Sequence, residues 1–235
     1  MVGPALAGLL ITLFDVPGGY VVMIVFQLAA LVSIVFASIP TAYDNVFAPS
    51  KVFRNLAQGL IYTRTQKTIL AIILITIVMN LLLFPIMQMV PVVARDILHV
   101  GPGLMGVLQS SSGFGSFFGS LYLASLTRVE RHGLVFLGGS LIGTIGLLGF
   151  ALSRWYGLSL VGLLVMGIGV AGFGVMQMTL VMLVSRDEMR GRALGVVSLA
   201  IGVSPFGALL IGALASSIGT GNAIVVNAVA AIGLL

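Results

Sequence analysis

Five side chains in the uncharged apolar run from 69 to 94 could contact a small molecule inside a membrane. They lie at positions i, i+4, i+7, i+8 and i+11, which share one face of a helix: Asn80, Phe84, Met87, Gln88 and Pro91. The amides offer hydrogen bonds without fixed charge, Met and Phe adapt to varied apolar ligands, and proline permits bending. This pattern predicts one wall of a ligand cavity. The alternative is that Asn and Gln bond neighbouring helices, at roughly 0.6 kcal/mol per bond.

Two further apolar runs carry similar side chains. Phe173 and Gln177 fall on one helical face of the run from 157 to 184, whose many glycines favour close helix packing. Gln109 lies near one end of the run from 103 to 127, where serines and glycines also indicate packing. We therefore add Phe173, Gln177 and Gln109 to the candidate substrate-binding residues.

The apolar runs offer no chemistry for catalysis. None of the six complete runs contains Asp, Glu, Lys, Arg or His, so no Ser–His or paired-carboxylate site is expected inside a membrane. His99 and His132 lie in loops without companions at metal-ligand spacing, and the chain has no cysteine. We expect no catalytic residue, metal or cofactor, and hence no enzyme. Protons stay a candidate coupling ion for which these runs supply no titratable group.

Composition places these residues in a membrane protein. Hydrophobic residues make up 59% of the chain and charged residues 7%, with a mean hydropathy of +1.22. A soluble domain would carry roughly 25% charged residues, so that class is excluded. The net charge of +5 comes from short loops between apolar runs, where basic residues orient membrane helices. Nucleic acid is therefore not expected as a partner, whereas the lipid bilayer is.

Uncharged runs separated by polar residues predict an all-α, polytopic transmembrane bundle. The six complete spans are 20–39, 69–94, 103–127, 134–153, 157–184 and 194–215. Residues 1–14 and 222–235 are also apolar, but at about 1.5 Å per residue each covers only about 21 Å of a roughly 30 Å core. We therefore expect a bundle that is truncated inside a helix at both ends.

The basic residues predict the orientation of the bundle. Nine of the eleven lie in the alternate loops 40–68, 128–133 and 185–192, which are therefore expected to be cytoplasmic. In the longest loop, apolar residues at helical spacing predict an amphipathic helix lying in the membrane interface: Phe53, Leu56, Ala57, Leu60 and Ile61. We interpret this loop as a tether between two bundles, with a regulatory partner site as the alternative.

A charged cluster closes the run from 157 to 184 on the predicted cytoplasmic side. Its members are Arg186, Asp187, Glu188, Arg190 and Arg192. These side chains could form ion pairs that are made and broken as the bundle moves, which would be a gating role. The alternative is that they serve only as charges that set the topology.

A weak internal repeat relates the first apolar residues to the last. At a constant offset of 201 positions, Pro4 pairs with Pro205 and Gly18 with Gly219, together with several aliphatic residues. Six helix starts separate the equivalent segments, so the same topology recurs with the same orientation. This is typical of a transporter built from two parallel six-helix halves.

Four stretches resemble the major facilitator superfamily, and more narrowly its multidrug and siderophore exporter branch of enterobactin exporters and macrolide efflux proteins. They are Gly3–Gly8, similar to the end of the antiporter motif; Val90–Pro102, similar to the exit of helix 7; Gly106–Gly119, similar to helix 8; and Arg186–Ala193, similar to the loop from helix 10 to helix 11. The resemblance implies a chain running from the end of helix 5 to the start of helix 12. It also implies that helices 7, 8, 10 and 11 face the central pathway.

The sequence thus predicts three regions in a multi-pass protein of the cell membrane. Residues 1–39 would end the first six-helix half, 40–68 would form the cytoplasmic linker, and 69–235 would form the second half. The expected function is efflux of drug-like or siderophore-like small molecules by alternating access. The alternatives are a fragment that cannot transport by itself and a membrane protein of the same fold that does not transport.

Overall fold

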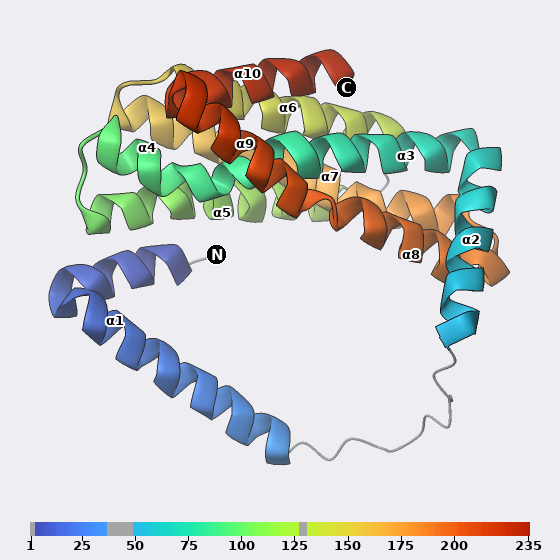
Figure 1. Ribbon diagram of the computed structural model, residues 1–235, viewed down its shortest axis with the longest axis horizontal. Helices are drawn as coiled ribbons and strands as arrows, with labels where there is room; N and C mark the ends of the chain where they lie inside the picture. Colours follow the sequence, from blue (N-terminus) through green and yellow to red (C-terminus); the bar gives the residue numbers. More distant parts are fainter. Residues whose placement is uncertain (1–2, 37–48, 127–130) are drawn as a thin grey trace.

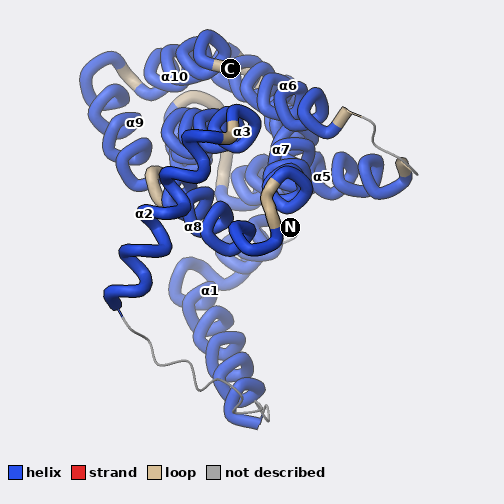
Figure 2. The backbone as a smooth tube through the Cα atoms, turned by 90° about the vertical axis from the view of Figure 1, so that its right-hand side faces the viewer, coloured by secondary structure: helices blue, strands red, loops and turns tan. Residues whose placement is uncertain are grey.

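The computed structural model describes residues 3–36, 49–126 and 131–235, and within these ranges the fold is a bundle of helices with no strand (Figure 1). The all-α prediction is therefore confirmed. Five segments are long and apolar enough to cross a membrane: Pro17–Phe36, Lys67–Asp96, His132–Leu152, Tyr156–Val184 and Asp187–Ile218. The tube view in Figure 2 looks nearly along the axes of the main bundle.

The predicted span from 69 to 94 is a helix in four pieces. Helix α3 (Lys67–Val78) passes into a π-helical turn, η1 (Met79–Leu83), then a 3-10 segment, η2 (Phe84–Met89), and then α4 (Val90–Asp96). Pro85 and Pro91 lack an N–H group and cannot make the α-helical bond to the carbonyl four residues earlier. The interruption that the prolines predict is present. It is spread over the eleven residues of η1 and η2, where the helical repeat changes, and it is not a single kink.

The predicted span from 194 to 215 is longer than expected and is also broken. A 3-10 turn, η3 (Asp187–Met189), leads into α8 (Arg190–Ile201), and α9 (Ser204–Ile218) follows after Gly202 and Val203. Pro205 lies in the first turn of α9, where its missing N–H leaves no bond unmade. Helix α9 packs against η1 and η2, so the two broken spans meet at their interruptions.

The two spans approach each other closely at Gly207. A Cβ atom at this position would lie 2.2 Å from the carbonyl oxygen of Leu81 and 2.6 Å from the Pro85 ring. Leu81 is the residue whose α-helical partner would have been the amide at Pro85. Helix α9 therefore covers the backbone that the proline interrupts, as is required of irregular backbone at membrane depth.

Three unbroken helices form the other side of the bundle. Helix α5 (Pro102–Ser125) and helix α6 (His132–Leu152) both pack along α7 (Tyr156–Val184). Glycines at these contacts leave no room for a side chain: a Cβ at Gly167 would lie 2.0 Å from the Ser112 carbonyl oxygen, and one at Gly169 would lie 2.1 Å from the Gly143 nitrogen. The predicted packing role of these glycines is therefore confirmed.

Helix α5 corresponds to the predicted span 103–127 but is not among the five segments that qualify by length and hydropathy. Its several serines lower its mean hydropathy. Most of their hydroxyls donate to carbonyls of the same helix, as Ser120 does to Ser116 at 2.7 Å, while Ser116 donates to Gly167 of α7 at 3.0 Å and the buried Ser110 hydroxyl has no hydrogen-bond partner among the described residues. These bonds allow α5 to lie within the bundle at little cost.

The first and last segments of the chain each contain a sharp turn between helices. Helix α1 (Gly3–Phe36) merges two arms that meet at Asp15, with φ 58° and ψ −178°, and α9 joins α10 (Thr220–Leu234) at Gly219, with φ 84° and ψ 152°. Both residues adopt backbone angles that favour glycine. The predicted partial helix 1–14 and span 20–39 thus correspond to the arms of α1, and residues 1–2 and 37–39 lie outside the described residues.

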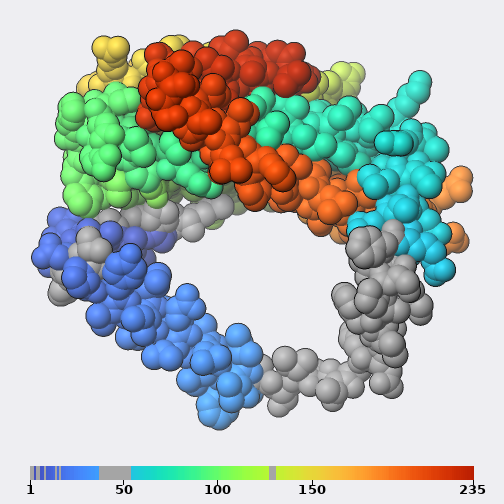
Figure 3. All heavy atoms as spheres, in the orientation of Figure 1, coloured from blue at the N-terminus to red at the C-terminus, as the bar shows by residue number. Residues whose placement is uncertain are grey.

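Helix α1 contacts the rest of the described chain mainly through α5. The second arm of α1, which includes Pro17–Phe36, stands apart from the main bundle in Figure 3. No residue in its most apolar stretch is buried. A row of exposed apolar side chains follows this arm, including Val21, Phe26 and Val35. Exposure on this scale is expected of a helix that faces lipid or other membrane helices.

The linker contains a helix, α2 (Pro49–Thr65), at the place where the apolar spacing predicts one. Leu60 and Ile61 are exposed, whereas Gly59 and Thr63 are buried. A Cβ at Gly59 would lie 2.9 Å from the Arg192 carbonyl oxygen, so the helix packs on α8 through its small residues. Within the predicted apolar face, Leu56 is half-buried beside α8, where its Cδ2 would lie 3.9 Å from a Cβ at Gly195. The placement of this face in the membrane interface stays a prediction. Phe53 lies among side chains that the structure does not describe.

Candidate functional site

Three polar side chains in the membrane interior meet between α3, η1 and α7. The amide nitrogen of Gln177 donates to the Thr76 hydroxyl at 2.7 Å, and that hydroxyl donates to the Ile72 carbonyl at 2.7 Å. The Asn80 amide donates to the Thr76 carbonyl at 2.9 Å. All three side chains are buried, so each polar atom that bonds here avoids a cost of several kcal/mol in hydrocarbon. We call Thr76, Asn80 and Gln177 the polar cluster.

An aromatic stack lies about one turn away, on η2, α6 and α7. The Phe84 and Phe173 ring centroids are 5.9 Å apart and tilted by 54°, and Phe173 stacks on Phe136 of α6 at 5.3 Å. Phe173 and Phe136 are buried, whereas Phe84 is half-buried. Such pairs contribute about 0.5–1.5 kcal/mol beyond their buried area. Phe84 is therefore held in place from one side and open on the other.

A small cavity lies beside Phe84, where η2, α5 and α7 meet. It has a volume of about 120 Å³. Its walls mix apolar and hydroxyl side chains with the backbone of two glycines: Phe84, Met87, Ser112, Gly113, Ser116, Met166, Gly167 and Val170. Two flexible methionines, a phenyl ring and two hydroxyls give a surface that can adapt to an apolar ligand and orient one polar group.

The structure separates the five residues that were predicted to share one face. Asn80 is buried in the polar cluster, Phe84 and Met87 line the cavity, and Gln88 is exposed. The prediction assumed 3.6 residues per turn throughout. The π-helical turn has more residues per turn than an α-helix and the 3-10 segment has fewer, so the two changes rotate the side chains in opposite senses. These residues thus differ in their surroundings, and their role as one wall of a ligand cavity stays a prediction.

The remaining predicted contacts lie around this region but not in the cavity wall. Gln177 belongs to the polar cluster, and the Phe173 ring packs against the Phe84 ring. Gln109 is half-buried on α5, one turn before Ser112, whose hydroxyl donates to the Gln109 carbonyl at 3.0 Å. The two amides at 80 and 177 thus bond protein groups in this structure, which matches the packing alternative.

Sequence reasoning missed Thr76 and did not include the two hydroxyls of the cavity. Thr76 is four residues before Asn80, so it shares the helical face on which the amide lies. That spacing was a usable signal. Ser112 and Ser116 form a stripe that was interpreted only as packing, and Ser116 does bond α7 while also lining the cavity.

The charged cluster at the end of α7 connects that helix to α2. The Arg190 guanidinium lies 2.9 Å from the Asp187 carboxylate and donates to the Met182 carbonyl at 3.0 Å. The Arg192 guanidinium lies 3.1 Å from the Met189 sulfur. The Arg186 amide donates to the Tyr62 hydroxyl of α2 at 3.2 Å. The predicted ion pairing is therefore present for Asp187 and Arg190.

Metal-binding groups are not gathered anywhere in the described part of the chain, where no three His, Asp or Glu side chains lie close enough to hold an ion. The second ion pair of the described residues joins neighbours, with Arg95 Nε 2.6 Å from the Asp96 carboxylate, and both side chains are exposed. This arrangement is that of a solvated ion pair at the end of α4.

Comparison with protein families identifies the family of this chain. A family model described as transmembrane secretion effector matches residues 1–235, which is the whole chain. A search of curated proteins finds no match.

Proposed function

Since the chain belongs to the transmembrane secretion effector family of the major facilitator superfamily, it is a transmembrane transporter, and we propose that it exports drug-like or siderophore-like small molecules by alternating access. One observation carries the substrate class. The cavity where η2, α5 and α7 meet is lined by Phe84, Met87 and Met166 together with two serine hydroxyls, and none of its walls is charged. Such a surface suits an apolar molecule with a few uncharged polar groups.

Ligand contact is assigned first to Phe84 and Met87, which line the cavity. Phe173 holds the Phe84 ring, and the polar cluster of Thr76, Asn80 and Gln177 fixes α3 against α7 one turn away. Gln88 and Gln109 lie outside the cavity wall and would contact the outer parts of a ligand larger than about 120 Å³.

Alternating access requires parts that move relative to each other while the site stays assembled. We assign residues 1–39 to one six-helix half, 40–68 to the linker and 69–235 to the other half. The bond from the Arg186 backbone amide to the Tyr62 hydroxyl joins the linker helix to the second half, and the Asp187–Arg190 pair follows it directly in the chain. With Arg192, they are the contacts that would open and re-form during gating.

Ligand binding by site variants tests this proposal. The chain in detergent would be titrated with a catecholate siderophore and with a macrolide, and binding would be followed by isothermal calorimetry. Removing the Phe84 ring in Phe84→Ala is expected to weaken binding of the preferred compound by on the order of tenfold, because the aromatic contact is lost together with its apolar area. Met87→Ala is expected to have a smaller effect in the same direction.

The matched control is Phe117→Ala, which removes an exposed ring from α5 outside the cavity. It should leave the dissociation constant unchanged. If Phe84→Ala and Phe117→Ala weaken binding equally, the cavity is not the ligand site. If neither compound binds to a chain that is folded by circular dichroism, the substrate class is wrong.

A further inference from the structure

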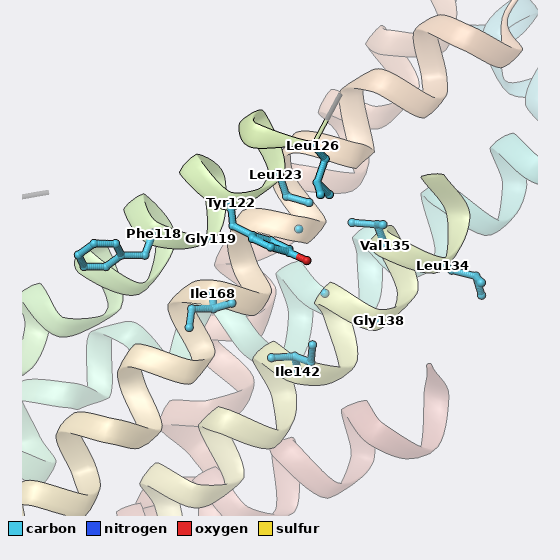
Figure 4. Close-up of a pocket in the computed structure, with 12 residues that line it drawn as sticks. Phe118, Gly119, Tyr122, Leu123, Leu126, Leu134, Val135, Gly138, Ile142 and Ile168 are labelled. Atoms are coloured by element: carbon cyan, nitrogen blue, oxygen red, sulfur yellow. The ribbon is translucent and has the colours of Figure 1, made fainter. Parts of the chain in front are cut away.

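A second concave surface lies on the outside of the bundle, between α5 and α6. Its volume is about 500 Å³, and its lining comes from α5 (118–126), α6 (134–142) and α7 (168–172). Figure 4 shows Tyr122 reaching from α5 across the groove toward α6, with Leu134 and Ile142 on the far side. We call this surface the outer groove. It is separate from the cavity beside Phe84.

Glycines create the outer groove. Helix α5 contacts α7 at Gly119, where a Cβ would lie 2.9 Å from the Ala171 side chain, and α6 contacts α7 at Gly139, where a Cβ would lie 2.8 Å from the Phe173 nitrogen. Each helix thus packs closely on α7, whereas α5 and α6 contact each other much less than either contacts α7. The floor of the groove is therefore α7 itself, at Ile168 and Gly172.

The length and polarity of the outer groove match one acyl chain of the bilayer. The lining spans eight residue steps on both α5 and α6, which is about 12 Å at about 1.5 Å per residue. Half of a roughly 30 Å hydrocarbon core is about 15 Å. The lining is almost wholly apolar, and Phe118, Leu134 and Ile142 are exposed to the surroundings of the bundle.

One end of the outer groove carries positive charge. Leu134 and Val135 line that end, and Arg131 immediately precedes α6 with its side chain exposed. The Tyr122 side chain adds a hydroxyl from α5 farther along the groove, near Gly138 (Figure 4). Arg131 belongs to the 128–133 loop, which the distribution of basic residues predicts to be cytoplasmic. On that side of a membrane, anionic lipid headgroups attract Arg and Lys.

We propose that the outer groove binds one anionic phospholipid, with an acyl chain along α7 between α5 and α6 and the phosphate at Arg131. The site is independent of the transported molecule. It orders a lipid of the leaflet on the side of the 128–133 loop and fills the space that the glycines leave between α5 and α6.

Glycine substitutions on α6 test the proposal with a matched control. A Cβ at Gly138, which lines the groove, would meet no atom within 4 Å, and the same holds at exposed Gly149, which does not line it. Leucine therefore fits the backbone at both positions but fills the groove only at the first. The purified chain would be titrated with phosphatidylglycerol and with phosphatidylcholine, and lipid adducts would be counted by native mass spectrometry.

Gly138→Leu is expected to weaken phosphatidylglycerol binding by on the order of tenfold, because the leucine side chain displaces about two methylene groups of the acyl chain from the groove. Gly149→Leu should bind phosphatidylglycerol as tightly as the unmodified chain. Arg131→Gln should remove an about fivefold preference for phosphatidylglycerol over phosphatidylcholine. Equal effects of the two leucine variants would overturn the groove as the site. Equal binding of both lipids by the unmodified chain would overturn the role of Arg131.

Circular dichroism and gel filtration show whether each variant is folded. If Gly138→Leu does not fold, Gly138→Ala replaces it, since one methyl group shortens the groove without crowding a neighbour. A partial loss of phosphatidylglycerol adducts in this variant supports the proposal, and an unchanged adduct distribution contradicts it.

Discussion

The span from 67 to 96 and helix α7 lie side by side, and both contain residues that disfavour helices, yet only the first is interrupted. The prolines at 85 and 91 remove N–H donors, so the backbone changes to π and 3-10 turns. The glycines of α7 keep their N–H groups, and its 29 residues form one continuous helix. Loss of a donor changes the path of the backbone, whereas loss of a side chain changes how closely neighbours approach.

The two segments therefore position the site in different ways. The interrupted segment turns Phe84 and Met87 toward the cavity and leaves Gln88 exposed. Helix α7 supplies a straight surface on which α5 and α6 settle, and its Gln177 joins the two segments through Thr76. Substitutions on each segment should separate these roles.

The largest effect is expected where a glycine of α7 touches another backbone. Gly169→Ala would place a methyl group 2.1 Å from the Gly143 nitrogen, so α6 and α7 must separate. We expect a loss of about 1–3 kcal/mol in the free energy of unfolding, as for other overpacked cores. Denaturant unfolding in detergent, followed by circular dichroism, measures this change.

Gly174 on the same helix is the control for that prediction, because a Cβ there would meet nothing within 4 Å. Gly174→Ala should raise the free energy of unfolding by up to about 1 kcal/mol through helix propensity alone. A lower free energy of unfolding for Gly169→Ala and a higher one for Gly174→Ala would show that a methyl group on α7 destabilises only where it meets another backbone. A loss in both would mean that α7 depends on its glycines for flexibility and not for close approach.

A smaller effect is expected where the two segments are joined by a hydrogen bond. Thr76→Val and Gln177→Leu each remove one partner of the 2.7 Å bond, and the double variant removes both. A double-mutant cycle on the free energy of unfolding should give a coupling of about 0.6–1.7 kcal/mol. A coupling near zero would mean that Gln177 and Thr76 stabilise the bundle separately.

The smallest effect on stability is expected at the interruption itself. Pro85→Ala supplies an N–H that can donate to the Leu81 carbonyl. We expect the free energy of unfolding to rise by about 0.5 kcal/mol, which is at the low end for a hydrogen bond. Slowed hydrogen exchange of the new amide would show that the α-helical bond has formed. A loss of more than about 1 kcal/mol would instead show that contact between the proline ring and Gly207 dominates.

Much of the fold could be predicted from the sequence, because hydropathy adds along a helix and needs no knowledge of neighbours. The runs at 134–153 and 157–184 agree with α6 and α7 within about two residues. The charged residues separate the spans as expected, and the transporter family agrees with the resemblance of four short stretches. The linker helix was also predicted, but the face that contacts α8 was not.

The candidate site was predicted less well. Phe84 and Met87 do line a cavity, whereas Asn80 and Gln177 bond protein groups and Gln88 is exposed. The face of each side chain depends on the local helical repeat. The repeat changes around Pro85, where the backbone packs closely against Gly207 of α9, more than a hundred residues later in the chain.

The sequence by itself therefore determined that this protein is a bundle of membrane helices, where most helices begin and end, and to which family it belongs. Each of these depends on composition and on short local patterns. Only the tertiary structure decided that Gln177 bonds Thr76, that α5 and α6 leave the outer groove above α7, and that η1 and η2 meet α9 at Gly207. These contacts join residues far apart in the chain, and their geometry depends on backbones that approach within a few ångströms.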